Sequence, residues 1–289
     1  YATLDEALDR GWLDIEELGH GNVPRIRVRN TSFRPVFIMG GEIISGGKQD
    51  RIVERDVLLG ARSQYVTVPV YCTEQGRWDG STRFYSKKNL GTWSMRATAQ
   101  YAPSNAQHEI WGDISSSSRD MGVSSRTSAY QSVYEDTTVR QKIYRHEQYF
   151  QDIPRLAHDT VGVIVAVDGE IVSVDLFSSN SLFRQLWPKI LKASALAAVS
   201  RGRYGSADQG EAYHTLMARG WVRQSIAAAV SGDGSAAVFR GTDTGLVLET
   251  YRPLLGPEGI PTRVAWDALR GDGLLYTEAE QAIGIPALP

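Results

Sequence analysis

Four short strand-like runs within residues 23–72 constrain this fold more than any other feature of the chain. The first run, Arg25–Arg29, alternates polar and apolar residues, as a strand with one buried face does. The others are Val36–Met39, Arg51–Leu59 and Gln64–Tyr71, and short turns join them. Successive strands with short connections favour antiparallel pairing. The sequence therefore predicts an antiparallel β layer that is sandwich- or barrel-like.

Helical patterns follow the β layer and predict a helical middle. Ser104 and Gln107 have the spacing of a capping box at the start of a helix. Residues 124–150 have the periodicity of one long polar helix. Its aromatic residues are suited to stacking on bases, but their near-helical spacing favours packing in the core. These aromatic residues are Tyr130, Tyr134, Tyr144, Tyr149 and Phe150.

The chain changes character after about residue 152. An Asp-Gly pair between two β-rich runs predicts a hairpin at 161–177. Helices are predicted at 181–200 and 211–230, followed by short strands. The fold class is thus predicted to be α+β, with an N-terminal antiparallel β layer, a helical middle and a C-terminal hairpin with helices and short strands. The predicted parts are 1–152 and 153–289, unless the chain forms one continuous domain.

Composition excludes several classes of protein. With 289 residues, 42% of them hydrophobic and 22% charged, the chain has the composition of a globular protein. Its net charge of -2 lacks the basic footprint of nucleic-acid binding, so no nucleic-acid partner is predicted. No apolar run reaches the ~18 residues that span a bilayer. The oligomeric state and any cofactor stay unassigned.

Cysteine and histidine usage predicts no metal site. Cys72 is the only cysteine, so the chain has no intrachain disulfide and no thiolate zinc site. The five histidines are scattered and form no ligand motif. A single cysteine fits a reducing compartment, and the cytoplasm is expected. The chain begins with Tyr1, so removal of a preceding segment would leave secretion open.

The first of two polar motifs is Gly40–Arg51, which follows a predicted strand. Lys48 lies one residue too far along for a nucleotide-hydrolysing P-loop, and Gln49 replaces its hydroxyl residue. A looser anion site is one hypothesis, since Gly46-Gly47 allows close backbone approach to a ligand and Lys48 and Arg51 are suited to holding an anion. The competing interpretation is a tight hairpin with solvated charges.

The second motif, Val70–Trp78, follows the fourth predicted strand. Cys72 is a candidate nucleophile, although a lone cysteine at the end of an apolar strand is more often a small buried residue, and that interpretation is favoured. Arg77 and Trp78 are suited to clamping a carboxylate or phosphate and stacking on a ring. The alternative is a surface arginine beside a core tryptophan.

Together the two motifs resemble one family. This chain has G-E-I-I-S-G-G-K-Q-D-R and C-T-E-Q-G-R-W, and the family elements are G-E-x-x-x-G-x-K-Q-N-R and C-x-E-Q-G-R-W. The sequence is therefore similar to the ARG and Rhodanese-Phosphatase-superfamily-associated protein domain. Asp50 stands where the family usually has asparagine, so no amide-specific contact is carried over there. The resemblance implies a link to ADP-ribose or NAD metabolism, and it carries no established activity.

Three hypotheses about function follow from these residues. The first is an enzyme acting on a small phosphorylated or nucleotide-like ligand in a pocket lined by both motifs. There Glu42 or Glu74 would be the general acid or base, and Cys72 a less favoured nucleophile. The ligand would be held by Lys48, Arg51 and Arg77, oriented by Gln49 and Gln75, and stacked on Trp78. The alternatives are a non-catalytic binding or interaction module and a structural ion-pair network.

Overall fold

The computed structural model describes residues 1–18, 25–77, 83–101, 104–152, 162–167, 170–177, 179–201, 236–242, 245–251 and 263–267. The chain divides into two compact units. The first comprises Tyr1–Ile153 and Gln185–Gly202, and the second comprises Pro154–Arg184 and Arg203–Pro289. The sequence-based division at residue 152 stays a prediction.

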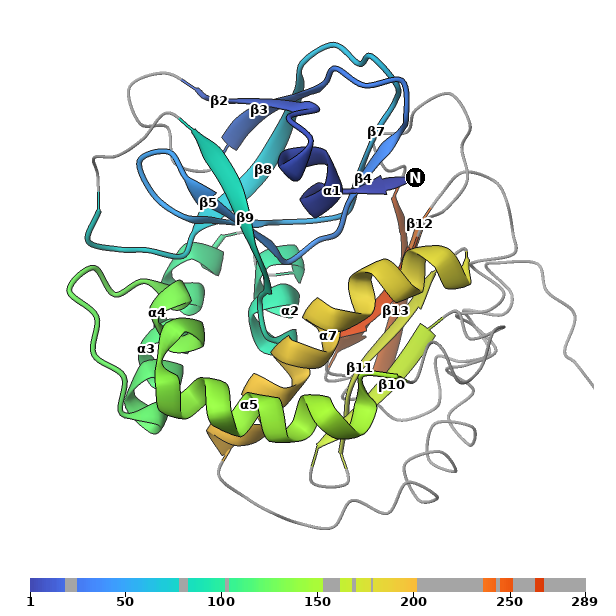
Figure 1. The fold of residues 1–289 in the computed structure, drawn as a ribbon. Coiled ribbons are helices and arrows are strands. Elements are labelled where there is room, and N and C mark those ends of the chain that lie inside the picture. The colour runs from blue at the N-terminus through green and yellow to red at the C-terminus, as the bar shows by residue number, and fades with distance from the viewer. Residues whose placement is uncertain are drawn as a thin grey trace, which may run out of the picture. The chain divides into compact units, whose positions relative to one another are not determined.

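A curled six-stranded sheet forms the β layer of the first unit (Figure 1). All of its neighbouring strands are antiparallel. In spatial order the strands are β2 (Leu13–Glu17), β3 (Arg25–Asn30), β8 (Val66–Cys72), β6 (Arg51–Val53), β5 (Glu42–Gly46) and β9 (Phe84–Leu90). The predicted antiparallel β layer and the α+β class are confirmed.

A smaller three-stranded sheet completes the β structure of this unit. Its order is β1 (Ala2–Thr3), β4 (Val36–Ile38) and β7 (Val57–Leu59). The prediction of one strand over 51–59 is wrong, because β6 and β7 belong to different sheets. Between them the Asp56 carboxylate accepts a hydrogen bond from the Gly40 backbone (2.7 Å), which ties this bend to the start of the first motif.

Strand β9 is not among the strand-like runs of the sequence, although it belongs to the large sheet. The strand pairs with β5, from Glu42 opposite Leu90 to Gly46 opposite Phe84. Its register shifts between Glu42 and Ile44, and Lys88 has a positive φ of 58°. Both irregularities disrupt the alternation of polar and apolar residues by which a strand is predicted.

Five helices accompany these strands within the described part of residues 1–152. They are α1 (Leu4–Asp9), α2 (Trp93–Tyr101), α3 (Ala106–Met121), α4 (Tyr130–Glu135) and α5 (Thr137–Phe150). The single long helix predicted over 124–150 is wrong. Asp136 ends α4 and caps α5, where its carboxylate accepts a hydrogen bond from the Val139 backbone (3.0 Å).

The capping box predicted at Ser104 and Gln107 is also absent from helix α3. The N-cap is Asn105, and its side chain makes no capping hydrogen bond. The Gln107 amide binds the backbone of Cys72 instead, accepting from its N–H (2.8 Å) and donating to its carbonyl (2.9 Å). A long-range contact has therefore replaced the local one that the spacing suggests.

The middle of the large sheet is covered on both faces. Successive residues of a strand point to opposite faces, so Ile43 and Ile52 enter a core shared with helices α2 to α5. Ile44 and Val53 enter a second core with α1 and the small sheet. Strands β5 and β6 are consequently buried along their whole length. This burial decides the environment of the first polar motif.

Helix α7 spans Asn180–Arg201, and Pro188 lies inside it. Its residues from Gln185 onward belong to the first unit, where the Trp187 indole donates a hydrogen bond to the carbonyl of Phe150 at the end of α5 (3.0 Å). Among the described residues, no helix combines the length and apolar character needed to cross a membrane.

A five-stranded sheet belongs to the second unit. Its order is β10 (Gly162–Val167), β11 (Glu170–Phe177), β14 (Arg263–Asp267), β12 (Ala236–Thr242) and β13 (Gly245–Tyr251). The antiparallel pairing of β10 with β11 confirms the predicted hairpin. Strands β12, β13 and β14 are short strands of the kind that the sequence predicts after it. The helix predicted at 211–230 lies outside the described residues.

Candidate functional site

The structure brings the two polar motifs together in the centre of the large sheet. The first motif contributes β5, a tight turn and the start of β6, while the second contributes the end of β8 and the loop after it. Strands β6 and β8 are neighbours, and Arg51 lies opposite Cys72 in their register. Their polar side chains form three separate buried clusters.

The first cluster is built on the Arg77 guanidinium. Its Nε and Nη2 contact Glu74 Oε2 (2.8 and 2.7 Å), and Nη2 also contacts Asp50 Oδ1 (3.1 Å). The remaining Nη1 donates to the carbonyl of Gly47 (2.8 Å). Both carboxylate side chains are under 10% exposed, and that of Arg77 is 25% exposed. The Arg77 fork is therefore engaged by the protein itself.

The pKa values of these carboxyls move in opposite directions. Burial raises the pKa of Asp50, and the hydrogen bond from the Gly46 backbone opposes that rise. Burial also acts to raise the pKa of Glu74, but hydrogen bonds from Arg77 and Thr127 prevail and hold it below its ordinary value. Glu74 is thus a stabilised carboxylate, a state that suits ion pairing better than proton donation at neutral pH.

The glycine pair of the first motif is packed against β9. Gly46 and Gly47 have φ values of 102° and 57°, which favour glycine. A Cβ on Gly46 would lie 2.2 Å from the carbonyl oxygen of Arg83, and one on Gly47 would lie 2.7 Å from the Phe84 ring. The close backbone approach that glycine allows is therefore made to the neighbouring strand.

The second cluster surrounds Cys72. Its thiol donates a hydrogen bond to Gln49 Oε1 (2.7 Å), and Arg51 Nη1 donates to the same oxygen (3.1 Å) and to the sulfur (3.2 Å). Arg51 Nη2 also lies 3.6 Å from Glu17 Oε1. Cys72 is fully buried. Burial raises the pKa of its thiol to about 11, against the effect of the Arg51 cation.

Cys72 is therefore expected to react slowly in the folded protein. Its thiol is protonated at neutral pH, and the thiolate is the reactive form. At pH 8 we expect alkylation by iodoacetamide to be at least about a hundredfold slower than in urea, because a pKa near 11 lowers the thiolate fraction by roughly that factor. Mass spectrometry of timed samples measures both rates. Equal rates would support the predicted nucleophile.

The third cluster joins Glu42 to helix α7. Glu42 Oε1 forms a close ion pair with Lys189 Nζ, and Glu42 Oε2 accepts from the Met39 backbone (2.8 Å). Lys189 Nζ also contacts Asp5 Oδ2 (2.8 Å). Burial raises the pKa of Glu42, with Lys189 opposing. Burial likewise works against the charge of Lys189, yet the carboxylates of Glu42 and Asp5 hold its pKa above the ordinary value.

The remaining predicted site residues lie apart from these clusters. Lys48 is half-buried, and its backbone N–H donates to Glu17 Oε1 (2.8 Å). Gln75 is exposed, and Trp78 lies outside the described residues. Among the described residues, Glu42 and Glu74 share no hydrogen bond, and each has its own cation. Their predicted acid–base roles and those of the binding residues stay predictions.

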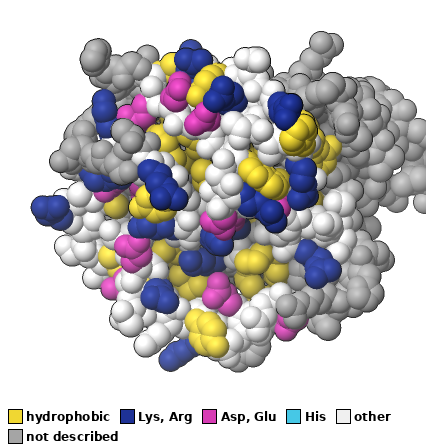
Figure 2. Space-filling view, turned by 45° about the horizontal axis from the view of Figure 1, so that its top comes forward, with side chains coloured by type: hydrophobic (Ala, Val, Ile, Leu, Met, Phe, Trp, Pro, Cys, Tyr) yellow, Lys and Arg dark blue, Asp and Glu magenta, His cyan; other side chains and the backbone are white. Residues whose placement is uncertain are grey.

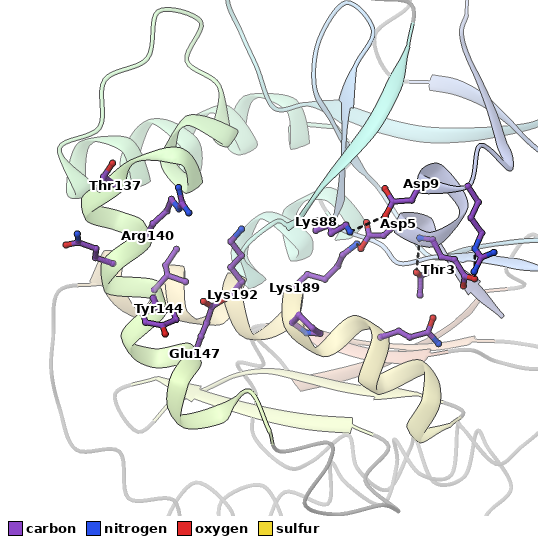
Figure 3. A pocket seen from close by; sticks show the side chains of 16 residues that line it. Thr3, Asp5, Asp9, Lys88, Thr137, Arg140, Tyr144, Glu147, Lys189 and Lys192 are labelled. Carbon is purple, nitrogen blue, oxygen red and sulfur yellow. Dashed lines mark hydrogen bonds and ion pairs between the residues drawn. The ribbon is translucent and has the colours of Figure 1, made fainter.

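A cavity of about 1000 Å³ lies in the first unit beside these clusters, between helices α1, α5 and α7 and strand β9 (Figure 3). None of its lining residues belongs to 40–51 or 70–78. This cavity is therefore not the pocket lined by both motifs that the sequence predicts. Its charged lining residues are Asp5, Glu6, Asp9, Arg10, Lys88, Arg140, Glu147, Lys189 and Lys192. Sequence analysis missed this cavity, although Lys189 and Lys192 are spaced to share one helix face.

Ion pairs inside the cavity neutralise three of its cations. Arg10 pairs with Glu6 (3.1 Å), Lys88 with Asp9 (3.1 Å), and Lys189 with the Asp5–Glu42 cluster. Among the described residues, Arg140 has no ion-pair or side-chain hydrogen-bond partner, and Lys192 has no carboxylate within ion-pair distance. The cavity wall therefore keeps two cations available.

Lys192 has a distinctive environment within this wall. Its Nζ donates to Asn89 Oδ1 (2.6 Å) and lies 4.8 Å from the centre of the Tyr134 ring. Burial lowers the pKa of Lys192; the Glu147 carboxylate opposes this change, and Arg140 adds to it. A lysine with a lowered pKa in a pocket is typical of a functional site.

Tyr144 is the aromatic residue of the cavity wall. The sequence places it in the buried stripe of its helix, and this is wrong, because 59% of its surface is exposed. Tyr130 and Tyr134 are buried as expected. Tyr144 follows Arg140 by one helical turn on α5, and both line the cavity (Figure 3). An exposed ring thus stands beside a guanidinium that has no ion-pair partner in the described part of the chain.

Charge is mixed on one face of the molecule. On the face drawn in Figure 2, basic side chains alternate with acidic and apolar ones instead of forming one basic field. Within the described ranges, no group of three or more His, Cys, Asp and Glu side chains is arranged to hold a metal ion. Among the described residues, the cavity's cations are therefore a local feature suited to an anionic ligand.

Comparison with known proteins identifies the family and nothing more specific. No curated protein matches the chain. No solved structure matches it either. One family model matches residues 1–245, which include both polar motifs and all the residues that line the cavity. The chain belongs to the family of the ARG and Rhodanese-Phosphatase-superfamily-associated Protein domain.

Proposed function

We propose that this protein binds a small phosphorylated or nucleotide-like ligand in the cavity between α1, β9, α5 and α7. The observation that carries this proposal is a pair of cations, Arg140 and Lys192, that have no carboxylate partner among the described residues. They lie in a cavity of about 1000 Å³ whose other cations are ion-paired. This volume is at the upper end of the range for small-molecule sites.

The two cations support an anionic ligand for different reasons. The planar fork of Arg140 is suited to two parallel hydrogen bonds with a phosphate. Lys192 has a lowered pKa because it is buried and lies near Arg140. A bound phosphate would supply the missing negative charge and favour the protonated amine. Binding of such a ligand would therefore raise the pKa of Lys192.

The exposed Tyr144 ring supports a ligand with a planar base. Stacking on an aromatic side chain is worth about 1–3 kcal/mol per base and does not depend on which base it is. Its position one turn from Arg140 would place a base next to a phosphate group. ADP-ribose and NAD are the first ligands to test, because the family resemblance points toward them.

In this proposal the polar side chains of the two motifs have a structural role. Glu42, Gln49, Asp50, Arg51 and Glu74 are buried and paired, which favours an ion-pair framework behind the cavity. Glu42 remains the best candidate for a catalytic group, since Lys189 links it to the cavity wall. A non-catalytic binding module is the second candidate, favoured by the engagement of Arg77 with protein groups.

Calorimetry with ADP-ribose, NAD, AMP, ribose 5-phosphate and inorganic phosphate tests the proposal. Arg140→Ala is expected to weaken binding of every phosphorylated ligand at least about tenfold, the effect of one charge-assisted hydrogen bond. Tyr144→Ala should weaken only the ligands that carry a base. Arg145→Ala is the matched control, because Arg145 is exposed on the same helix and does not line the cavity.

Two results would contradict the proposal. One is the absence of binding or thermal stabilisation by any of these ligands, since a ligand at a hundred times its Kd adds about 2.7 kcal/mol of stability. The other is binding that Arg140→Ala and Arg145→Ala affect equally. A ligand that binds and is converted to product would identify an enzyme, and Glu42→Gln would then be the first catalytic variant.

A further inference from the structure

A chain of hydrogen bonds joins the cavity to the first polar motif. Lys192 Nζ donates to Asn89 Oδ1 (2.6 Å), and Asn89 Nδ2 donates to Gln131 Oε1 (2.5 Å). Gln131 Nε2 donates to Ser45 Oγ (3.2 Å), and Ser45 Oγ donates to Asp50 Oδ2 (3.2 Å). Four elements, α7, β9, α4 and β5, and the turn after β5 supply one residue each.

Every donor in this chain points the same way. The ammonium of Lys192 begins it, and the carboxylate of Asp50 ends it. With both amides in this orientation, each N–H or O–H along the path meets an oxygen. A cation at the donor end and an anion at the acceptor end both favour this direction, and aligned hydrogen bonds strengthen one another.

The interior of the chain is closed to solvent. Asn89, Gln131, Ser45 and Asp50 are each at most 5% exposed. A buried polar group that loses its partner cannot replace it with bulk water. Only Lys192 reaches the cavity wall. Loss of a hydrogen-bond partner at the Ser45 end would therefore change the partners available to Gln131, then to Asn89, and then to Lys192.

We infer that Asn89 and Gln131 are positioning residues through which Ser45 and Asp50 of the first motif hold the Lys192 ammonium toward the cavity. The hydrogen bonds determine this assignment, and the consequence for ligand affinity rests on the proposed function. The motif thereby acts on the cavity without lining it. Asn89 and Gln131 belong to neither motif, and sequence analysis assigned them no role.

The groups that face Lys192 come from three elements. Asn89 on β9 accepts its hydrogen bond, the Tyr134 ring on α4 lies beside it, and Arg140 and Glu147 on α5 act on its charge. Loss of the Asn89 acceptor would leave the burial of Lys192 and the Arg140 charge in place. Breaking the chain should therefore lower the pKa of Lys192 further.

Carbon-13 NMR of the full-length protein tests this inference without a ligand. The chain has six lysines, so ε-¹³C-lysine labelling yields few signals, and Lys192→Arg assigns the one of interest. Ser45→Ala and Gln131→Met each interrupt the path at a different step. In both, the Lys192 signal is expected to move and its titration midpoint to fall below the wild-type value.

Ser94→Ala is the matched control. It also deletes a serine hydroxyl that donates to a carboxylate, that of Asp113, which lies outside the chain. The Lys192 signal should keep its wild-type position in this variant. Folding of each variant is checked by its backbone amide spectrum. An unchanged Lys192 titration in folded Ser45→Ala and Gln131→Met would overturn the inference.

Phosphate or ADP-ribose titrations then separate this inference from the proposed function. Ser45→Ala is expected to weaken binding about twofold to tenfold, the range for one net hydrogen bond. If Lys192 responds to Ser45→Ala but no ligand binds the wild type, the positioning chain stands and the proposed function fails. If Arg140-dependent binding occurs but Lys192 does not respond, the reverse holds.

Discussion

Replacement of Lys189 with methionine is expected to lower the free energy of unfolding by about 3–5 kcal/mol. The substitution leaves the Glu42 carboxylate fully buried, with only the Met39 N–H as its described hydrogen-bond donor. Removing one partner of a buried ion pair is costly because the other charge stays desolvated. Urea unfolding of the wild type and Lys189→Met at pH 8 measures the difference.

A second variant separates the ion pair from the packing of the lysine side chain. Lys189→Met combined with Glu42→Gln should recover most of the lost stability, because glutamine is uncharged and can still accept from the Met39 backbone. Lys142→Met is the control for a lysine outside the cluster, with an expected change within about 0.5 kcal/mol. A small effect of Lys189→Met alone would show that the pair is not buried in solution.

The deficit of Lys189→Met, which is the loss in its free energy of unfolding relative to the wild type, should depend on pH. Burial already raises the pKa of Glu42 in the wild type, and Lys189 opposes that rise. Without Lys189, the pKa of Glu42 is higher still, so the folded variant takes up a proton more readily than its unfolded chain. The deficit is therefore expected to be smaller at pH 5 than at pH 8.

Replacement of Arg77 with alanine is the second change with a large expected effect. It removes the cation shared by Asp50 and Glu74 and the donor to the Gly47 carbonyl. The expected loss is roughly 2–4 kcal/mol at pH 7, less than for a fully buried pair, because a quarter of the Arg77 side chain is exposed. Urea unfolding measures it, with the exposed Arg126→Ala as control.

The pH dependence of the stability lost in Arg77→Ala follows from the pKa of Glu74. Its pKa is lowered in the folded protein from an ordinary 4.5, so its pairing with Arg77 contributes stability above pH 4.5. That contribution is lost as the pH falls through the lowered pKa. The wild type and Arg77→Ala should thus converge in stability as the pH falls below 4.5. A deficit that is constant from pH 7 to pH 3 would contradict the charge pairing.

Local sequence patterns predict elements of both units. Thr3 and Glu6 have the spacing of a capping box, and the Thr3 hydroxyl accepts a hydrogen bond from the Glu6 backbone (3.4 Å) at the start of α1. The hairpin at 161–177 was also predicted, from an Asp-Gly pair between β-rich runs. These features depend on residues a few positions apart, so the sequence shows them directly.

The elements that were missed depend on distant partners. Strand β9 has poor alternation and exists through its pairing with β5, forty residues earlier in the chain. Gln107 appeared to cap a helix, and it binds the Cys72 backbone instead. In both cases a contact across the sheet outweighs the local preference. A single sequence does not display such contacts.

The sequence by itself determined the α+β class, the family and the closeness of the two polar motifs, because neighbouring strands bring their ends together. Only the tertiary structure decided that these motifs are buried clusters, since helices α2 to α5 cover one face of β5 and β6, and α1 with the small sheet covers the other. It also decided where the cavity lies. Asp5, Lys88, Arg140 and Lys192 come from four separate elements, and only the packed fold brings their charges together.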